Sequence, residues 1–214
     1  GGTADNLVLR AAAQLAREHR LPPVRFHLVK SIPSGAGLGG GSADGAFALR
    51  MLDQHFNLGL SAEVLEYAAR LGSDCPFFVH NVPAHVSGRG EHITPIELDI
   101  KGWWLVVIHP GIHVPTAEAF GWITPSDDRP GLGVLGGTSP TDWKDTLRND
   151  FTEAVAHRHP EIAEALERLG AAGAAFHDMS GSGSAVFGFF AQDPGPDSTF
   201  RMQPDWQVWT GRLE

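Results

Sequence analysis

The spacing of apolar residues at the start of the chain predicts a helix followed by a strand. In residues 4–19 apolar side chains recur every four positions, which places them on one face of an α-helix. These side chains are Leu7, Ala11 and Leu15. Asp5 or Asn6 is suited to cap the first turn of this helix. Residues 22–30 then alternate apolar and polar side chains, which is the two-residue period of a half-buried strand.

Two further helices are predicted beyond a glycine-rich stretch that follows this strand directly. They cover residues 43–57 and 61–72, with Gly59 between them and Gly72 at the end of the second. The pattern then changes to short strands separated by turn residues. These strands are expected at 84–88, 92–99 and 103–110.

The change of pattern indicates a domain boundary, which divides the chain into domains at 1–95 and 96–214. The second domain continues with a segment at 114–120 and a loop rich in Gly, Pro and Asp at 125–140. Helices are predicted at 141–157 and 160–170, and strands at 174–179, 184–190 and 206–210. Because helices and strands do not alternate strictly, the fold class is α+β.

Composition narrows the classes of protein that this chain can represent. The 214 residues are 42% hydrophobic, enough for a real core, yet no apolar run approaches the roughly 18 residues of a membrane span. A formal net charge of −9 disfavours nucleic acid as a partner, because neutralising phosphates requires a basic surface. With Cys75 as the single cysteine no internal disulfide can form, and a cytoplasmic location is expected.

The glycine-rich stretch contains five glycines in the seven residues from Gly35 to Gly41. It includes a G-x-G-x-x-G pattern, but a dinucleotide-binding unit needs a second strand after its helix, and here a second helix follows. A P-loop needs a lysine, and none lies between Lys30 and Lys101. The stretch is therefore interpreted as a backbone cradle for an anion at the start of a helix, although a plain flexible connector stays possible.

A second loop of this kind, "MSGSGSAVFGFF" at 179–190, lies between two predicted strands. Alone it would be an ordinary hairpin turn, but together with the first loop it suggests two phosphate-facing turns that converge in a cleft between domains. The stretch "IPSGAGLGGGSADGA" resembles the ATP loop of the GHMP kinases, and "DMSGSGSAVFG" resembles their third glycine motif. The resemblance implies an N-terminal domain like domain 2 of ribosomal protein S5, without its first strands, and a ferredoxin-like C-terminal domain.

Three segments narrow the resemblance within that family. The triple glycine before Ser42, the block "LGSDCPFF" at 71–78 and "HPGIHVPTAEAF" at 109–120 are similar to the branch that phosphorylates 4-diphosphocytidyl-2-C-methyl-D-erythritol on its 2-hydroxyl. The resemblance implies ATP as phosphate donor, with Mg²⁺ bound to its phosphates. A sister kinase for homoserine, mevalonate or a sugar is the alternative, as is a catalytically silent ATP-binding fragment.

The resemblance also assigns roles to individual residues. Asp74 matches the base that accepts the proton of the attacking hydroxyl, and a carboxylate is ionised at neutral pH. An aspartate that simply caps or turns the chain before Pro76 is the competing interpretation. The ATP-binding residues would be Pro33, Ser34, Gly35, Ala36, Gly37, Leu38, Gly39, Gly40, Gly41 and Ser42, with Asn6 and Lys30. A helix cap explains Asn6 almost as well, and Lys30 could equally be a solvated strand end.

On the substrate side the resemblance points to Thr116, Phe120, Gly181 and Gly183. Phe120 matches an aromatic residue that stacks on cytosine, although a core phenylalanine is the competing interpretation. No metal ligands are assigned, because the histidine pairs 109/113 and 157/159 lack a third ligand at a suitable spacing. The oligomeric state stays open.

One departure from the family concerns the start of the chain. Family members begin with a strand carrying a catalytic lysine, followed by a tyrosine and a histidine that hold the cytidine, whereas Gly1 here leads directly into helical sequence. The only tyrosine, Tyr67, lies within a predicted helix. We therefore expect that this chain is the remainder of a longer protein.

Overall fold

The computed structural model of the chain describes residues 5–124 and 135–214, so that most of the loop predicted at 125–140 lies outside the described residues. The described residues form two compact units. The first comprises residues 5–34 and 39–97, and the second comprises 35–38 and 98–214. The glycine-rich loop is thus divided between the units, which a boundary placed only at 95/96 does not anticipate.

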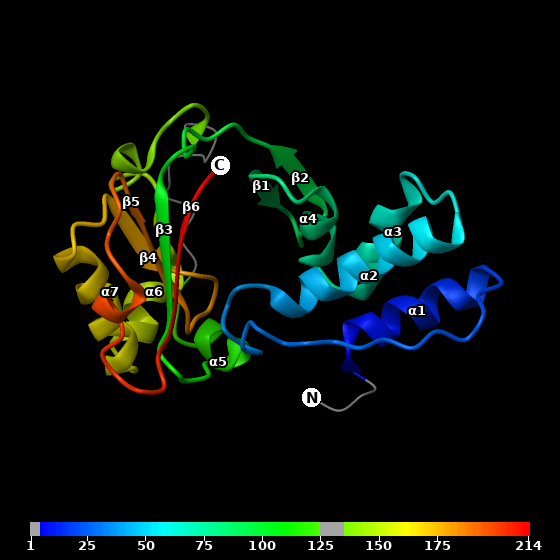
Figure 1. Cartoon of the computed structure of the whole chain (residues 1–214), viewed down its shortest axis with the longest axis horizontal. Coiled ribbons are helices and arrows are strands. Elements are labelled where there is room, and N and C mark those ends of the chain that lie inside the picture. The colour runs from blue at the N-terminus through cyan, green and yellow to red at the C-terminus, as the bar shows by residue number, and fades with distance from the viewer. Residues whose placement is uncertain (1–4, 125–134) are drawn as a thin grey trace. The chain divides into compact units, whose positions relative to one another are not determined.

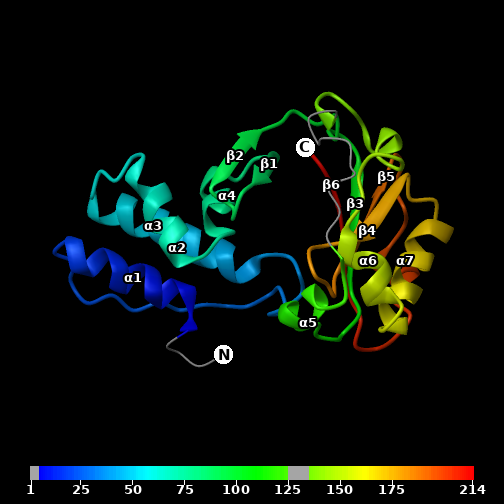
Figure 2. The same cartoon turned by 180° about the vertical axis from the view of Figure 1, so that it is seen from behind.

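The first unit contains four helices, α1 (Leu7–Glu18), α2 (Gly40–Phe56), α3 (Glu63–Leu71) and α4 (Cys75–His80). Three of them were predicted, and α4 was not. Helices α1 and α2 lie side by side (Figures 1 and 2), and α1 begins where Asn6 caps it, its Oδ1 accepting from the Val8 N–H at 2.9 Å. The apolar face predicted for α1 is buried against α2 and α3. The buried residues of this core include Ala11, Leu15, Leu49, Leu52, Tyr67 and Leu71.

A hairpin completes the first unit. Its strands, β1 (Ala84–Ser87) and β2 (His92–Pro95), pair antiparallel with Val86 opposite Ile93. The strand predicted at 22–30 is wrong, because this segment has no regular secondary structure. Of its alternating apolar side chains only Phe26 packs against the helical core, while Val24 and Leu28 are exposed. No described strand pairs with the segment, and backbone pairing is what defines a strand.

The second unit is built on a four-stranded antiparallel sheet of β3 (Trp104–His109), β4 (Phe176–Met179), β5 (Val186–Phe190) and β6 (Gln207–Arg212). The strand order is β4-β5-β3-β6, with Val106 of the central strand opposite Gly188 on one side and Thr210 on the other. Helices connect β3 to β4 along the chain, and β5 lies between these two strands in the sheet. This is the split β-α-β arrangement of a ferredoxin-like fold.

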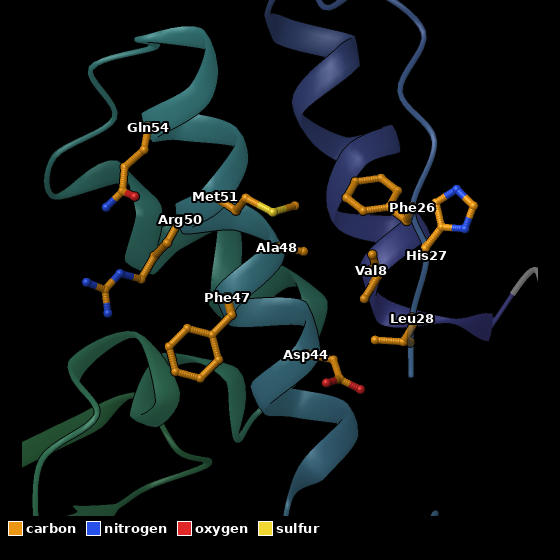
Figure 3. Close-up of a pocket in the computed structure, with 10 residues that line it drawn as sticks. All are labelled: Val8, Phe26, His27, Leu28, Asp44, Phe47, Ala48, Arg50, Met51 and Gln54. Carbon is orange, nitrogen blue, oxygen red and sulfur yellow. The ribbon is translucent and has the colours of Figure 1, made fainter. Parts of the chain in front are cut away.

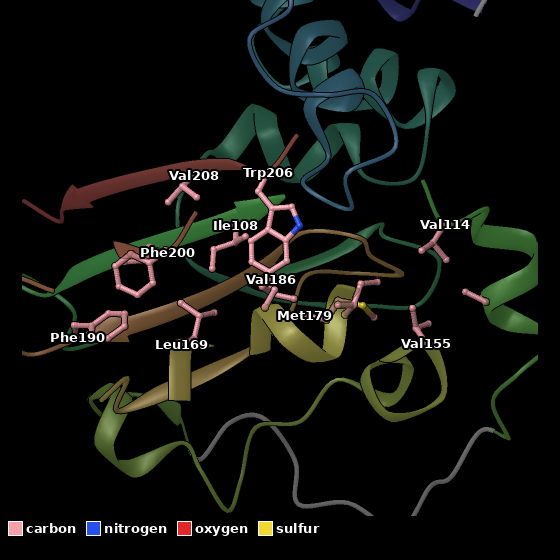
Figure 4. Packing of buried hydrophobic residues seen from close by; sticks show 14 residues of the cluster. Ile108, Val114, Val155, Leu169, Met179, Val186, Phe190, Phe200, Trp206 and Val208 are labelled. Atoms are coloured by element: carbon pink, nitrogen blue, oxygen red, sulfur yellow. The ribbon is translucent and has the colours of Figure 1, made fainter. Parts of the chain in front are cut away.

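The helices of the second unit are α5 (Thr116–Phe120), α6 (Asp150–Ala156) and α7 (Pro160–Ala171), with 3₁₀ turns η3 (Pro140–Asp142) and η4 (Asp197–Thr199). Helices α6 and α7 lie on one face of the sheet (Figures 1 and 2). The hydrophobic core of this unit includes the buried residues Ile108, Leu169, Val186, Phe200 and Trp206 (Figure 4).

The helix predicted at 141–157 is wrong over its first half. The segment makes a single 3₁₀ turn capped by Ser139, and α6 begins only after Asn149. The cause is the tertiary packing of one side chain. Trp143 is buried in a separate cluster with Leu135 and Phe176, and its indole Nε1 donates to Thr138 Oγ1 at 2.9 Å, which holds the chain in a tight turn. Among the described helices of both units, none is long and apolar enough to cross a membrane.

Candidate functional site

In the second unit, the apex of the first glycine loop is hydrogen-bonded to the second glycine loop. The carbonyl of Ala36 accepts from the Ala185 N–H, and the carbonyl of Gly37 accepts from Ser180 Oγ, both at 2.9 Å. The two loops lie far apart in the sequence, yet they form one backbone assembly. The predicted convergence of these two turns is therefore observed for residues 35–38 and 180–185.

Gly37 makes this close approach possible. Its φ is +77°, and a Cβ built on it would lie 2.2 Å from the Ser180 carbonyl oxygen and 2.8 Å from that of Gly183. No side chain fits in this space. Gly181, with φ of +57°, approaches from the other side, because its Cβ would lie 3.2 Å from the Gly37 carbonyl oxygen. Glycine is thus required here by contact as well as by backbone conformation.

The remainder of the first loop starts α2 in the first unit. Gly39 is the N-cap residue in the left-handed conformation, with φ of +66° and the ring of Phe78 against its Cα. The first turn of α2 contains no acidic side chain, so the positive end of the helix is not neutralised from within. Pro33 and Ser34 precede the apex, while Gly40, Gly41 and Ser42 form the first turn. Such a turn offers backbone N–H groups to an anion.

Asp74 lies in the same unit, immediately before α4. It is exposed, and although it occupies the N-cap position its side chain makes no capping hydrogen bond. Asp74 is therefore not engaged as a helix cap, but it does lie in the turn before Pro76, as the competing interpretation of a turn residue also expects. The turn is fixed by its neighbours, because Gly90 of the hairpin has φ of +105° and a Cβ on it would lie 2.2 Å from the Ser73 carbonyl oxygen.

The start of α2 and the turn that carries Asp74 meet at Cys75. This residue is completely buried. Burial raises the pKa of the Cys75 thiol, the Ser42 hydrogen bond lowers it less, and the Asp74 charge raises it further. Cys75 is therefore a protonated core residue at the start of α4, next to Asp74.

A groove of the first unit runs between α1, α2 and the extended segment (Figure 3), and two of its lining residues, Asp44 and Val8, are bonded to Lys30 and Asn6 respectively. The groove has a volume of about 460 Å³. Its lining residues are Val8, Phe26, His27, Leu28, Asp44, Phe47, Ala48, Arg50, Met51 and Gln54. The Lys30 ammonium pairs with the Asp44 carboxylate, and Asn6 caps α1, so both have partners within the protein.

The residues expected on the substrate side come together in the second unit. Thr116 Oγ1 lies 2.9 Å from Ser182 Oγ, which places the start of α5 against the loop that contains Gly181 and Gly183. The side chain of Phe120, at the end of α5, is 61% exposed, so the alternative that it is a core residue does not hold. Its ring packs perpendicular to the Phe151 ring, with the ring centroids 4.9 Å apart and the planes at 86°.

Sequence reasoning missed three residues that organise this region, namely Asn149, Asp178 and Ser180. The serines interleaved with glycines at 180–184 gave a signal for Ser180, because short hydroxyl side chains often bond nearby backbone. An asparagine before a short helical pattern gave a signal for Asn149 as an N-cap. Asp178, inside a strand, gave none.

The histidines do not form a metal site in the part of the chain that the structure describes. No group of three His, Cys, Asp or Glu side chains is arranged to hold an ion there. Burial lowers the pKa of His109, whose Nδ1 accepts from the Gly111 N–H at 3.3 Å. The His113 ring instead packs against Gly35, whose Cβ would lie 2.3 Å from it.

Comparison with known proteins identifies related domains in both parts of the chain. Residues 6–82 match the GHMP kinases N terminal domain, and residues 139–200 match the GHMP kinases C terminal domain. The 4-diphosphocytidyl-2-C-methyl-D-erythritol kinase of Bacteroides thetaiotaomicron is 44% identical over 96% of this chain and 74% of its own length. The kinase of the same name from Parabacteroides distasonis is 38% identical over 97% of this chain and 77% of its own length.

Solved structures agree with this relationship. A crystal structure of 4-(cytidine 5'-diphospho)-2C-methyl-D-erythritol kinase matches 98% of this chain and 78% of its own chain, with a TM-score of 0.80 and 31% identity. The homoserine kinase of Cytophaga hutchinsonii matches 97% of this chain and 75% of its own, with a TM-score of 0.62, but at 14% identity it shows only the shared fold. From the two domain matches and these relatives it follows that the chain belongs to the GHMP kinase family.

Proposed function

We propose that this protein transfers the γ-phosphate of ATP to the 2-hydroxyl of 4-diphosphocytidyl-2-C-methyl-D-erythritol, a step in the synthesis of isoprenoid precursors by the non-mevalonate route. The observation that carries the proposal is the identity of 38 to 44% with kinases of that name over most of the chain. The assembly of the two glycine loops in the second unit supports phosphate chemistry. A cytoplasmic location stays a prediction.

The glycine loops suit a phosphoryl transfer because that reaction depends on positioning and on charge stabilisation. In our proposal the backbone of residues 33–42 binds the ATP phosphates, and Asn6 and Lys30 contribute from the nucleotide side. Lys30 would have to share its ammonium with Asp44 or exchange that partner for the nucleotide. Mg²⁺ would arrive on the ATP phosphates, and we assign it no protein ligand.

Asp74 is our candidate for the base that accepts the hydroxyl proton. It is exposed and makes no capping bond, so its carboxylate is available to a ligand. The transition state of phosphoryl transfer is loose, so the position of the base matters more than its basicity. The packing of Gly90 on Ser73 gives the turn that fixed position.

Phe120 and Thr116 are our candidates for the substrate side, with the backbone of Gly181 and Gly183. The exposed Phe120 ring, which packs perpendicular to the Phe151 ring, is suited to stack on a nucleobase. Thr116 is held beside the third glycine motif by Ser182.

The test is ADP release by the full-length gene product with each of three acceptors, namely the cytidine compound, homoserine and mevalonate. We expect turnover with the cytidine compound and none with the other two. Turnover with homoserine or mevalonate would assign the protein to another branch of the family. If ATP protects the glycine loops from proteolysis but no acceptor releases ADP, the protein is a silent nucleotide-binding module.

A further inference from the structure

Asn149 has a hydrogen-bond partner for every polar group of its side chain. The side chain Nδ2 donates to the carbonyl of Met179 at 2.8 Å and to that of Gly181 at 2.7 Å. Its Oδ1 accepts from the Phe151 N–H at 3.0 Å and thereby caps α6. One side chain therefore ties the start of α6 to the end of β4 and to the third glycine motif.

Asp178 adds further hydrogen bonds between the start of α6 and the end of β4. This buried carboxylate, 9% exposed, accepts from the Asn149 N–H at 2.8 Å and from the Met179 N–H at 2.7 Å. It also accepts from the Thr152 hydroxyl. A buried carboxylate is tolerated only when its oxygens are bonded, so this network strongly favours a single arrangement of α6 on β4.

The first turn of α6 also reaches the proposed base-binding ring. Phe151, two residues after Asn149, meets Phe120 edge to face at 4.9 Å. Phe120 follows Thr116 on α5, and Thr116 contacts Ser182 of the third glycine motif. The glycine motif is thus connected to Phe120 both through α5 and through α6.

We propose that Asn149 is a positioning residue that fixes the separation between the third glycine motif and the Phe120 ring. This inference rests on the proposed function, in which the cytosine of the substrate stacks on Phe120 while its reacting hydroxyl lies near the glycine motif. A substrate held at both ends reacts only if those ends are held at the right separation. A displacement of about 1 Å in such a site can cost about 100-fold in rate.

The chain offers a variant that separates this role from helix capping. Asn149→Ser keeps an oxygen for the Phe151 N–H, because serine is as good an N-cap as asparagine, but its hydroxyl cannot donate to two carbonyls at once. Asn149→Asp also keeps the cap, and its carboxylate would face the two carbonyl oxygens without a proton to give. Ser139→Ala is the matched control, because it removes a cap elsewhere in the same unit, at η3.

The experiment measures kcat, the KM for each substrate and hydrogen exchange of residues 180–184 in the full-length protein. We expect both Asn149 variants to lower kcat about 10- to 100-fold, with a smaller change in the KM for ATP and faster exchange of the loop. Ser139→Ala should leave all three unchanged. If Ser139→Ala lost as much kcat as the Asn149 variants, the loss would reflect general destabilisation, and the proposal would be overturned.

Hydrogen exchange keeps the inference distinct from the proposed function. If the wild-type protein does not turn over the cytidine compound, the proposed function fails. Faster hydrogen exchange of residues 180–184 in Asn149→Ser would still support the positioning role of Asn149. If the Asn149 variants keep both wild-type kcat and wild-type loop exchange, the positioning role is wrong.

Discussion

Substituting Gly37 by alanine tests whether the contact between the two glycine loops positions the ATP phosphates. In the structure a Cβ at this position would lie 2.2 Å from the Ser180 carbonyl oxygen and 2.8 Å from the Gly183 carbonyl oxygen. Both neighbours are backbone atoms, which cannot rotate away as a flexible side chain can. The new methyl group must therefore separate the first loop from the second.

The size of that displacement follows from the same distances. An ordinary contact begins near 3.4 Å, so a gap of 2.2 Å has to open by about 1.2 Å, the difference between the two. The Gly37 carbonyl would then lose its hydrogen bond from Ser180 Oγ, now 2.9 Å long. Alanine at φ of +77° adds a conformational cost of about 1–2 kcal/mol. A displacement of this size at a phosphate-binding loop predicts a loss of about 100-fold in kcat/KM for ATP.

Gly173 provides the matched control for the conformational cost. It lies in the second unit with φ of +88°, and no atom lies within 4 Å of the position that a methyl group would occupy, so Gly173→Ala carries the backbone strain without the collision. We expect Gly173→Ala to lose about 1–2 kcal/mol of unfolding free energy by urea titration, and Gly37→Ala to lose more, because it also separates the loops and breaks the Ser180 hydrogen bond. Only Gly37→Ala should lose kcat/KM for ATP. If the two variants show the same kcat/KM, contact between the loops does not position the nucleotide.

Three further predictions concern residues of both units. Asp74→Asn should lower kcat by about 10²- to 10⁴-fold, the usual contribution of a general base, while calorimetry shows unchanged ATP affinity; wild-type kcat would refute the assignment. Phe120→Ala should raise the KM for the cytidine compound about tenfold, as expected for a stack of about 1.4 kcal/mol, and equal effects on both substrates would exclude stacking. Tyr67 Oη donates to Glu18 Oε2 at 2.6 Å, which lowers the pKa of Glu18 below its ordinary 4.5 and raises that of Tyr67 above its ordinary 10.0. The pair should therefore stabilise the fold at neutral pH. This stabilisation is lost as the pH falls through the lowered Glu18 pKa, or as it rises through the raised Tyr67 pKa. Tyr67→Phe should accordingly lower the Tm at pH 7 more than at pH 3.

Periodicity and capping signals were sufficient wherever an element is specified by its own residues. Helix α1 begins at the predicted cap, Asn6, and α7 begins at Pro160, because caps and apolar faces act within one or two turns. The segment at 22–30 shows where this fails. Its alternation predicts a half-buried strand, yet Val24 and Leu28 are exposed and no described strand pairs with the segment, because a strand requires a partner that no local pattern can supply.

The same division applies to the candidate site. The two glycine loops, Asp74 and Phe120 were proposed from the sequence, because glycine suits places where backbone approaches a ligand and the family motifs keep these residues at short spacings. The Ser180 bond to Gly37 and the Asn149 bonds to Gly181 were not found, because they join residues that come together only when the sheet of the second unit has formed.

The sequence by itself thus determined the fold class and the family, since both are carried by short-range patterns. Only the tertiary structure decided how the glycine loops are held, that the Asp74 side chain makes no capping bond and that Phe120 is exposed. The physical reason is that burial and hydrogen-bond satisfaction depend on every segment packed against a residue, whereas propensity depends only on its neighbours along the chain.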